Sequence, residues 1–246
     1  MHAIRFFILS VLFVVLWANP AMPGPLERLL YPDKARLISV FPDVTRSVLK
    51  DDRVIYKRTY ENLLSTLRPG DRVVVAPISD RTLTSFAPVI DREIPGAASG
   101  LAKEAILKRA GHELEGALDS LLKRAPKVNE SRILDALNVE EQLIEGDRSR
   151  KIRWLIFLSD MLEDSDEARF EQENLSPARI KQIIERRKAH GTFPRLEGVR
   201  VLVAGARAKT TTKFFEVRGF WQEYTKAVGA PLERRDYVRD GLRFGN

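Results

Sequence analysis

The sequence predicts an α/β protein with a Rossmann-like, mainly parallel central sheet flanked by helices on both faces. Short apolar segments rich in β-branched residues alternate with longer segments whose apolar residues recur at helical spacing. This alternation is typical of strand–helix–strand units, whose right-handed crossovers place helices on both faces of a sheet. A chain of 246 residues with 44% hydrophobic residues can bury one sizeable core, which suits a single domain.

The predicted strands fall into two groups. Four are apolar over almost their whole length, as expected for central strands that are covered on both faces. These central strands are predicted at residues 36–41, 72–78, 151–158 and 199–204. We interpret residues 87–90 and 237–244 as edge strands, and Pro88 and Pro95 exclude the first of these from the centre of the sheet.

Helices are predicted between the strands, because apolar residues recur there every three or four positions. They cover residues 52–67, 98–125, 131–144, 176–189 and 211–228. Asn129 or Ser131 is expected to cap the third helix, and Pro177 lies in the first turn of the fourth. The aromatic residues of the last helix fall at helical spacing, which favours core packing over a surface for stacking nucleic-acid bases.

Residues 1–25 form an N-terminal signal peptide or membrane anchor, and residues 26–246 form the domain. Arg5 precedes an apolar run that ends at Trp17, which is shorter than the about 20 residues needed to span a bilayer. Ala18 and Ala21 offer an imperfect cleavage site, so cleavage and retention both stay open. In either case we expect a periplasmic or secreted domain, anchored to the inner membrane if the segment is retained.

The amino-acid composition excludes several classes of function. The absence of cysteine excludes disulfides, thiolate catalysis and sulfur-ligated zinc. The net charge of +7 comes from residues of mixed sign without a concentrated basic stripe, so no nucleic-acid partner is expected. With three histidines, none in a recognisable constellation, the sequence offers no candidate catalytic triad.

Oxygen-bearing side chains follow the predicted strands at the edge where ligands bind in open parallel sheets. Asp43, Thr45 and Ser47 alternate directly after the first strand. Ser131 opens a helical segment, and Asp160 ends the strand at 151–158. The D-x-T-x-S pattern alone is a weak signal. Together, these three sequence segments, which the predicted sheet places at the same edge, indicate a site.

This pattern resembles the metal-ion-dependent adhesion site (MIDAS) of von Willebrand factor A (vWA) and integrin I domains, over about residues 36–230. The family motif is D-x-S-x-S, a distant Thr, and an Asp that ends a later strand. The resemblance implies a bound Mg²⁺ and a protein partner whose acidic side chain completes the coordination. The implied metal residues are Asp43, Thr45, Ser47, Ser131 and Asp160.

The residue chemistry agrees, because Mg²⁺ prefers oxygen ligands and keeps some of its waters, although Mn²⁺ or Ca²⁺ is not distinguished. The chain also departs from the family pattern. Arg46 stands where a small residue is usual, Met161 replaces a common Gly, and Glu163 adds acid to the same loop. A cation beside a metal is unfavourable unless its side chain points away.

Two alternatives remain open at this point. The chain could be a metal-independent structural subunit of an envelope or conjugation-type assembly, in which Asp43 and Asp160 only cap turns or helices. It could also be a metal-dependent phosphoester hydrolase that uses the same two Asp residues. A phosphate-binding loop at Gly205 to Lys209 is disfavoured, because it lacks the second glycine and the spacing of that motif.

Overall fold

A six-stranded sheet forms the centre of the protein. The computed structural model describes residues 35–46, 48–97, 99–124 and 128–244. The strand order is β3-β2-β1-β4-β5-β6, and every pairing is parallel except that of β2 with the edge strand β3. The strands are β1 (Arg36–Pro42), β2 (Arg72–Val75), β3 (Ile90–Glu93), β4 (Ile152–Leu158), β5 (Val199–Ala204) and β6 (Tyr237–Val238). The predicted Rossmann-like α/β fold class is confirmed.

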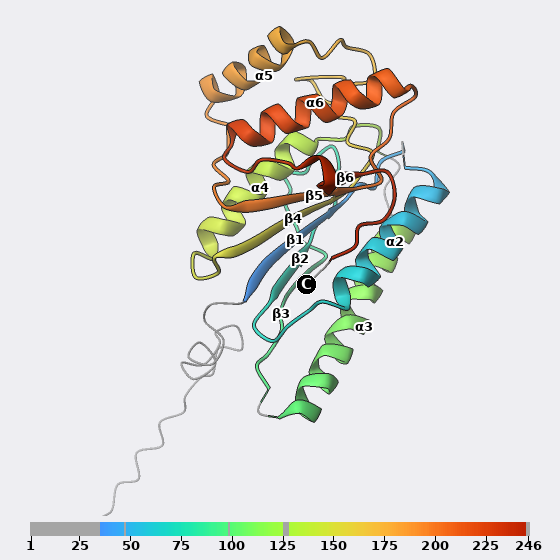
Figure 1. Cartoon of the computed structure of the whole chain (residues 1–246), viewed down its shortest axis with the longest axis vertical. Helices are drawn as coiled ribbons and strands as arrows, with labels where there is room; N and C mark the ends of the chain where they lie inside the picture. The colour runs from blue at the N-terminus through green and yellow to red at the C-terminus, as the bar shows by residue number, and fades with distance from the viewer. Residues whose placement is uncertain (1–34, 47, 98, 125–127, 245–246) are drawn as a thin grey trace, which may run out of the picture.

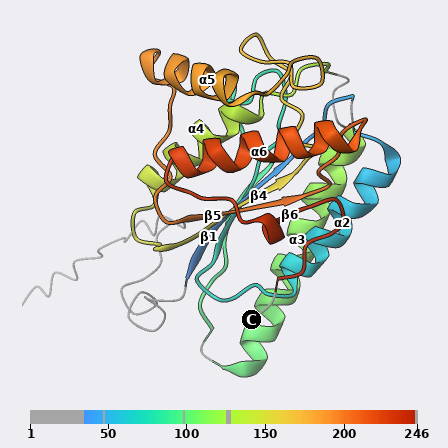
Figure 2. The same ribbon diagram turned by 45° about the horizontal axis from the view of Figure 1, so that its top comes forward.

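Helices cover both faces of the sheet, as Figures 1 and 2 show from two directions. α4, α5 and α6 lie over one face, and α2 and α3 lie over the other. The helices are α2 (Lys50–Leu64), α3 (Gly100–Arg124), α4 (Ile133–Gly146), α5 (Pro177–Ala189) and α6 (Thr211–Ala227), with a short 3₁₀ turn η1 (Arg234–Asp236).

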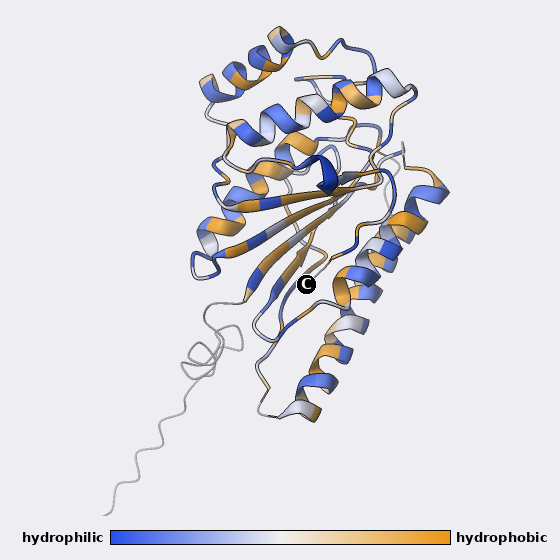
Figure 3. Cartoon of the chain, in the orientation of Figure 1, coloured by the Kyte–Doolittle hydropathy of each residue, from blue (hydrophilic) through white to orange (hydrophobic). Residues whose placement is uncertain are grey.

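Each central strand contributes alternate side chains to two cores, as the two-residue period of a strand requires. In β1, Leu37 and Phe41 pack under α4 and α6, whereas Ile38 and Val40 pack under α2 and α3. Figure 3 shows the apolar strands between helices whose outer faces are polar. Both cores hold the strands rigidly, so residues that follow the strand ends are placed with little freedom.

Two predicted edge strands differ from the structure. The first lies at Ile90–Glu93 rather than at residues 87–90, because Pro88 has no N–H to donate and pairing begins only beyond it. The last strand is only Tyr237–Val238. The chain beyond it leaves the sheet and runs along α2. There the Leu242 N–H donates to Thr59 Oγ1, and the Leu242 carbonyl accepts from the Asn62 side chain.

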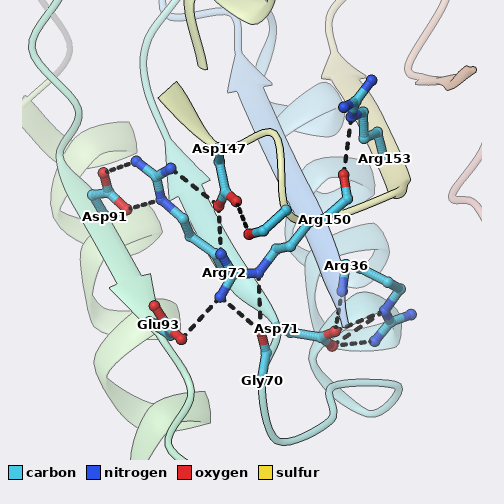
Figure 4. Close-up of polar contacts among 10 residues, drawn as sticks. Arg36, Gly70, Asp71, Arg72, Asp91, Glu93, Asp147, Arg150 and Arg153 are labelled. Atoms are coloured by element: carbon cyan, nitrogen blue, oxygen red, sulfur yellow. Dashed lines mark hydrogen bonds and ion pairs between the residues drawn. The ribbon is translucent and has the colours of Figure 1, made fainter. Parts of the chain in front are cut away.

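The amino end of the sheet is closed by ion pairs (Figure 4). The guanidinium of Arg36, fully buried at the start of β1, donates to both oxygens of the buried Asp71. Arg72 pairs with Asp91 on the neighbouring strand and with Asp147 after α4. These contacts join strands, turns and a helix end that are far apart in the sequence.

Within the described ranges, no helix is both long enough and apolar enough to cross a bilayer. The predicted signal or anchor segment, residues 1–25, lies outside these ranges.

Candidate functional site

The candidate site lies at the carboxyl ends of β1 and β4, the two adjacent strands from which the chain winds in opposite directions across the sheet. Open α/β sheets bind ligands at this reversal of strand order. Asp43 directly follows β1, and its N–H donates to Leu158 O at 2.8 Å. Ser159 and Asp160 directly follow β4, and Ser159 N–H donates to Ala204 O at 3.1 Å. The fold thus brings residues 43, 159 and 160 to one point.

The Asp43 carboxylate is the centre of a hydrogen-bond cluster. Its Oδ1 accepts from the N–H and the hydroxyl of Thr45, at 2.9 and 2.7 Å. Its Oδ2 accepts from the hydroxyls of Ser131 and Ser159, at 2.7 and 3.1 Å. Four donors therefore occupy the lone-pair positions of one carboxylate, and three of them are hydroxyl groups from three separate segments.

Asp43 carries no ion pair with any cationic side chain in the described part of the chain. Its exposed fraction is 0%. Burial raises the pKa of Asp43, while hydrogen bonds from Thr45, Ser131 and Ser159 oppose that rise. A buried carboxylate is costly unless it is paired with a positive charge or protonated, so this position favours a cation nearby.

Ser131 has a different role from the expected helix cap. α4 begins at Ile133, and its N-cap residue, Arg132, makes no side-chain capping bond. Instead Glu163 Oε2 accepts from Leu134 N–H at 2.9 Å, so the acid of the later loop caps the helix. Backbone hydrogen bonds in both directions pair Ser131 with Asp164, which aims the Ser131 hydroxyl at Asp43.

Glu163 is consequently neither a ligand to the Asp43 cluster nor a solvated loop residue. Its side chain is buried, and burial raises the pKa of Glu163 to about 8. Hydrogen bonds from Ser165 and Leu134 only partly oppose this rise. Glu163 therefore serves the end of α4 and fixes the position of the neighbouring Ser131.

Asp160 lies one residue beyond the cluster and contacts a cation of this chain. Its Oδ1 accepts from Leu162 N–H at 3.1 Å, and its side chain is almost fully buried. Arg207, from the loop after β5, places Nη2 at 3.9 Å from Asp160 Oδ2 and at 3.0 Å from Asp52 Oδ2. Asp52 lies in the first turn of α2 and also accepts from Leu49 N–H at 2.7 Å.

Tyr56 of α2 lies beneath the same edge of the sheet. Its side chain is fully buried, and its hydroxyl has no hydrogen-bond partner among the described residues. Burial raises the pKa of Tyr56 well above its usual value, and the negative charges of Asp43, Asp160 and Asp52 raise it further. Gly205 makes room for the ring, because a Cβ there would approach Tyr56 Cε1 to 2.6 Å.

The departures from the family motif have structural explanations. The Arg46 side chain is exposed, so its charge is solvated outside the cluster. Met161 takes a positive φ of 66°, a conformation that glycine adopts without strain. The Met161 side chain is buried, and its carbonyl accepts from Trp221 Nε1 at 2.9 Å, which holds the turn in this conformation.

Of the five predicted metal residues, the structure joins Asp43, Thr45 and Ser131 by direct hydrogen bonds and places Asp160 next to the cluster member Ser159. Ser47 lies outside the described residues.

Sequence reasoning missed four residues of the site. Ser159 and Arg207 follow strands, so the strand-end rule could have identified them. Asp52 and Tyr56 lie in a helix pattern, where nothing local distinguishes them from a cap and a core residue.

The oxygen cluster fits a hard divalent cation. No group of three or more His, Cys, Asp or Glu side chains suited to a metal occurs among the described residues. The cluster instead combines the Asp43 carboxylate with three hydroxyls, and the Asp160 carboxylate follows the cluster member Ser159. A hydroxyl that donates its hydrogen to Asp43 keeps lone pairs for a metal, so Thr45 and Ser131 can serve both groups at once.

No protein-family model and no curated protein matches the sequence. Among solved structures, the chain is similar to a von Willebrand factor type A protein from Catenulispora acidiphila, with 9% identity and a TM-score of 0.41 over 79% of this chain and 42% of that chain. It is similar to the PilB minor pilin from Streptococcus sanguinis, with 10% identity and a TM-score of 0.49 over 83% of this chain and 56% of that one.

A third similar structure is an aerotolerance-related membrane protein from Bacteroides fragilis, with 13% identity and a TM-score of 0.41 over 81% of this chain and 92% of that one. The chain thus spans less than half of the first structure and just over half of the second. Likenesses this distant carry no argument about a metal or a partner, and the fold is defined by the sheet topology of the chain itself.

Proposed function

We propose that this protein is an exported, vWA-like binding protein that engages a protein partner through a MIDAS-type divalent cation. Asp43, Thr45, Ser131 and Asp160 would hold the ion, together with Ser47. The ion is Mg²⁺ or, with similar ligand preferences, Mn²⁺ or Ca²⁺. The domain would act in the periplasm or outside the cell, where the N-terminal segment would direct it.

One observation carries the proposal: the fully buried Asp43 carboxylate is held by hydroxyl and N–H donors alone. A buried carboxylate is costly unless it is protonated, as the raised pKa of Glu163 favours for that residue, or lies beside a positive charge. Hydroxyls leave the charge of Asp43 in place while presenting further oxygen lone pairs. That combination is suited to a hard cation with an incomplete protein ligand set.

A site of this kind favours binding over catalysis. When bound, the ion offers a coordination position that an acidic side chain of another protein can fill with a charge-assisted contact. The residues of this chain would fix the position of the ion. Asp43 and Asp160 directly follow strands that are packed between two apolar cores, so little reorganisation would be required when a partner arrives.

Calorimetric titration of the full-length protein with Mg²⁺ tests the metal site. We expect saturable binding in the parent protein and none in Asp43→Ala. Asp91→Asn is the matched control, because it removes a carboxylate at the opposite end of the sheet and should leave binding unchanged. The absence of any metal-dependent heat in the folded parent would end the proposal.

The partner is tested separately by selecting displayed random peptides on the protein in Mg²⁺ and in EDTA. We expect peptides with Asp or Glu to be enriched in Mg²⁺ and to be released by EDTA. Enrichment that is unaffected by EDTA and by Asp43→Ala would contradict recognition through the ion.

A metal-independent structural subunit of an envelope or conjugation-type assembly is the second candidate function. The observation that favours it is Arg207, which already places a positive charge beside Asp160 and Asp52. In that case partners would bind through exposed apolar residues such as Leu49, Val54 and Phe215. Association that persists in EDTA and is weakened by Val54→Ser and Phe215→Ser would favour this candidate.

Phosphoester hydrolysis by the same two Asp residues is the third candidate. It requires metal-dependent turnover of a substrate such as p-nitrophenyl phosphate, abolished by Asp43→Ala.

A further inference from the structure

The partly exposed Arg207 side chain lies between solvent and two buried acids, Asp52 and Asp160. Its side chain is 40% exposed, whereas those of Asp52 and Asp160 are 6% and 2% exposed. The backbone N–H of Arg207 donates to Asp160 O at 3.1 Å, which ties the loop after β5 to the end of β4. The guanidinium therefore approaches the candidate metal site from the solvent side, on a backbone already fixed to the site.

The two carboxylates share this guanidinium unequally. Nη2 lies 3.0 Å from Asp52 Oδ2, within hydrogen-bond distance, but 3.9 Å from Asp160 Oδ2. Asp52 is thus the stronger partner. The contact with Asp160 can be lost while the contact with Asp52 keeps the cation in place.

The surrounding charges explain why a cation is needed there. Besides burial, the carboxylates of Asp43, Asp160 and Asp52 raise the pKa of the Tyr56 phenol, and the Arg207 guanidinium lowers it. The hydroxyl of Tyr56, which has no hydrogen-bond partner, adds a second polar group in the same interior. One guanidinium neutralises this acidic interior only in part.

We propose that Arg207 is a tethered internal cation that shares Asp160 with the divalent ion and so sets how tightly that ion is held. The inference rests on the proposed metal function and adds its regulation. A guanidinium beside Asp160 repels a divalent ion and competes for its carboxylate, because both are positive and both prefer the same oxygens. With an ion bound, Asp160 would turn from Arg207 toward the ion, and Asp52 would keep the guanidinium.

Removal of the tethered cation should strengthen metal binding. The loss of a residue with a merely structural role would instead weaken metal binding or leave it unchanged. We expect Arg207→Gln to bind Mg²⁺ at least about tenfold more tightly than the parent protein in calorimetry at low salt, since one repulsive charge is removed at short range. Arg207→Lys keeps the charge and should stay close to the parent. Arg46→Gln, at an exposed arginine of the same edge, is the matched control and should change little.

Thermal unfolding provides a second measurement that does not depend on partner binding. In EDTA, Arg207→Gln should unfold at a lower temperature than the parent, because Asp52 and Asp160 lose their neutralising charge. Saturating Mg²⁺ should raise the unfolding temperature of Arg207→Gln by more than it raises that of the parent.

Asp52→Asn keeps the test decisive if Arg207→Gln does not fold. This change frees the guanidinium for Asp160 alone, so Mg²⁺ should bind more weakly than it does in Asp164→Asn, which removes an exposed carboxylate near the site. Equal affinities of these two variants would overturn the inference.

The outcomes separate this inference from the proposed function. If neither the parent nor any variant binds Mg²⁺ or Mn²⁺, the metal function fails and Arg207 is a permanent structural cation. If the parent binds the ion and Arg207→Gln binds it equally or more weakly, the metal function survives and the tethered-cation inference is wrong.

Discussion

The two ends of the central sheet differ in the groups that contact their buried aspartates. At the amino end, Arg36 and Asp71 are both buried and form a bidentate ion pair, and neighbouring acids such as Asp147 also contact guanidinium groups (Figure 4). At the carboxyl end, Asp43 is equally buried but contacts hydroxyls and an N–H. Burial alone therefore does not distinguish a structural acid from a candidate ligand.

The identity of the donor makes the difference. A guanidinium neutralises the charge of a carboxylate, so the Arg36–Asp71 pair is complete by itself. Hydroxyls orient the Asp43 carboxylate without neutralising it and add lone pairs of their own. Arg207 is intermediate, because it contacts Asp160 only at 3.9 Å and from a half-exposed position.

The largest expected effect concerns the amino end. Arg36→Met should lower the free energy of unfolding by about 3–5 kcal/mol, because it leaves Asp71 buried without its counter-charge. It also removes the contact of the guanidinium with the Trp154 ring, 4.5 Å from the ring centroid. Urea unfolding at neutral pH measures this change.

Arg72→Met is the control for that prediction. The Arg72 side chain is partly exposed, its pair with Asp91 should contribute about 1 kcal/mol or less, and its other partner, Asp147, keeps its ion pair with Arg150. Equal losses in the two variants would show that burial of the pair is not what stabilises the amino end.

An intermediate effect concerns pH. The pKa of Glu163 is raised by burial to about 8 from the ordinary value of 4.5. Between these values the unfolded chain releases a proton that the folded protein keeps, so stability is full below about pH 4.5 and falls as pH rises to about 8. The loss is of the order of 1 kcal/mol per pH unit.

Glu163→Gln keeps an oxygen that accepts from Leu134 N–H but does not titrate, so its unfolding free energy should fall less between pH 5 and pH 8 than that of the parent. Urea unfolding at both pH values checks this. Glu173→Gln is the control, because the pKa of Glu173 is lowered and its removal should not flatten the decline. A parallel decline in the parent and in Glu163→Gln would contradict the assignment.

The smallest effect concerns Tyr56. Tyr56→Phe should raise the free energy of unfolding in EDTA by about 1 kcal/mol, because it removes a buried hydroxyl without a hydrogen-bond partner. Tyr60→Phe, one turn further along α2, removes a second buried hydroxyl of the same kind and should give a similar gain. A loss of stability in Tyr56→Phe alone would contradict the prediction, because it would mean that the Tyr56 hydroxyl makes a stabilising hydrogen bond.

Predictions from sequence were most accurate where one segment carries the whole signal. The apolar segments around Leu155 and Val201 predicted central strands because burial on both faces requires such a composition. The predicted helix starts at residues 176 and 211 lie within one residue of the observed starts of α5 and α6, where Ser176 and Thr210 accept from N–H groups in the first turns. The cap assigned to Ser131 was wrong, because a side chain from a distant loop, Glu163, took that place.

The sequence by itself determined the fold class, the order of strands and helices, and the edge of the sheet at which Asp43 and Asp160 lie. These features depend on hydrophobic period and on strand direction, both of which can be followed along the chain. Only the tertiary structure decided which donors meet each acid. Ser131 reaches Asp43 across 88 positions, and Arg207 reaches Asp52 across 155. No local sequence pattern predicts such pairings, because hydrogen bonds and ion pairs depend on the distance between groups in space and not on their separation along the chain.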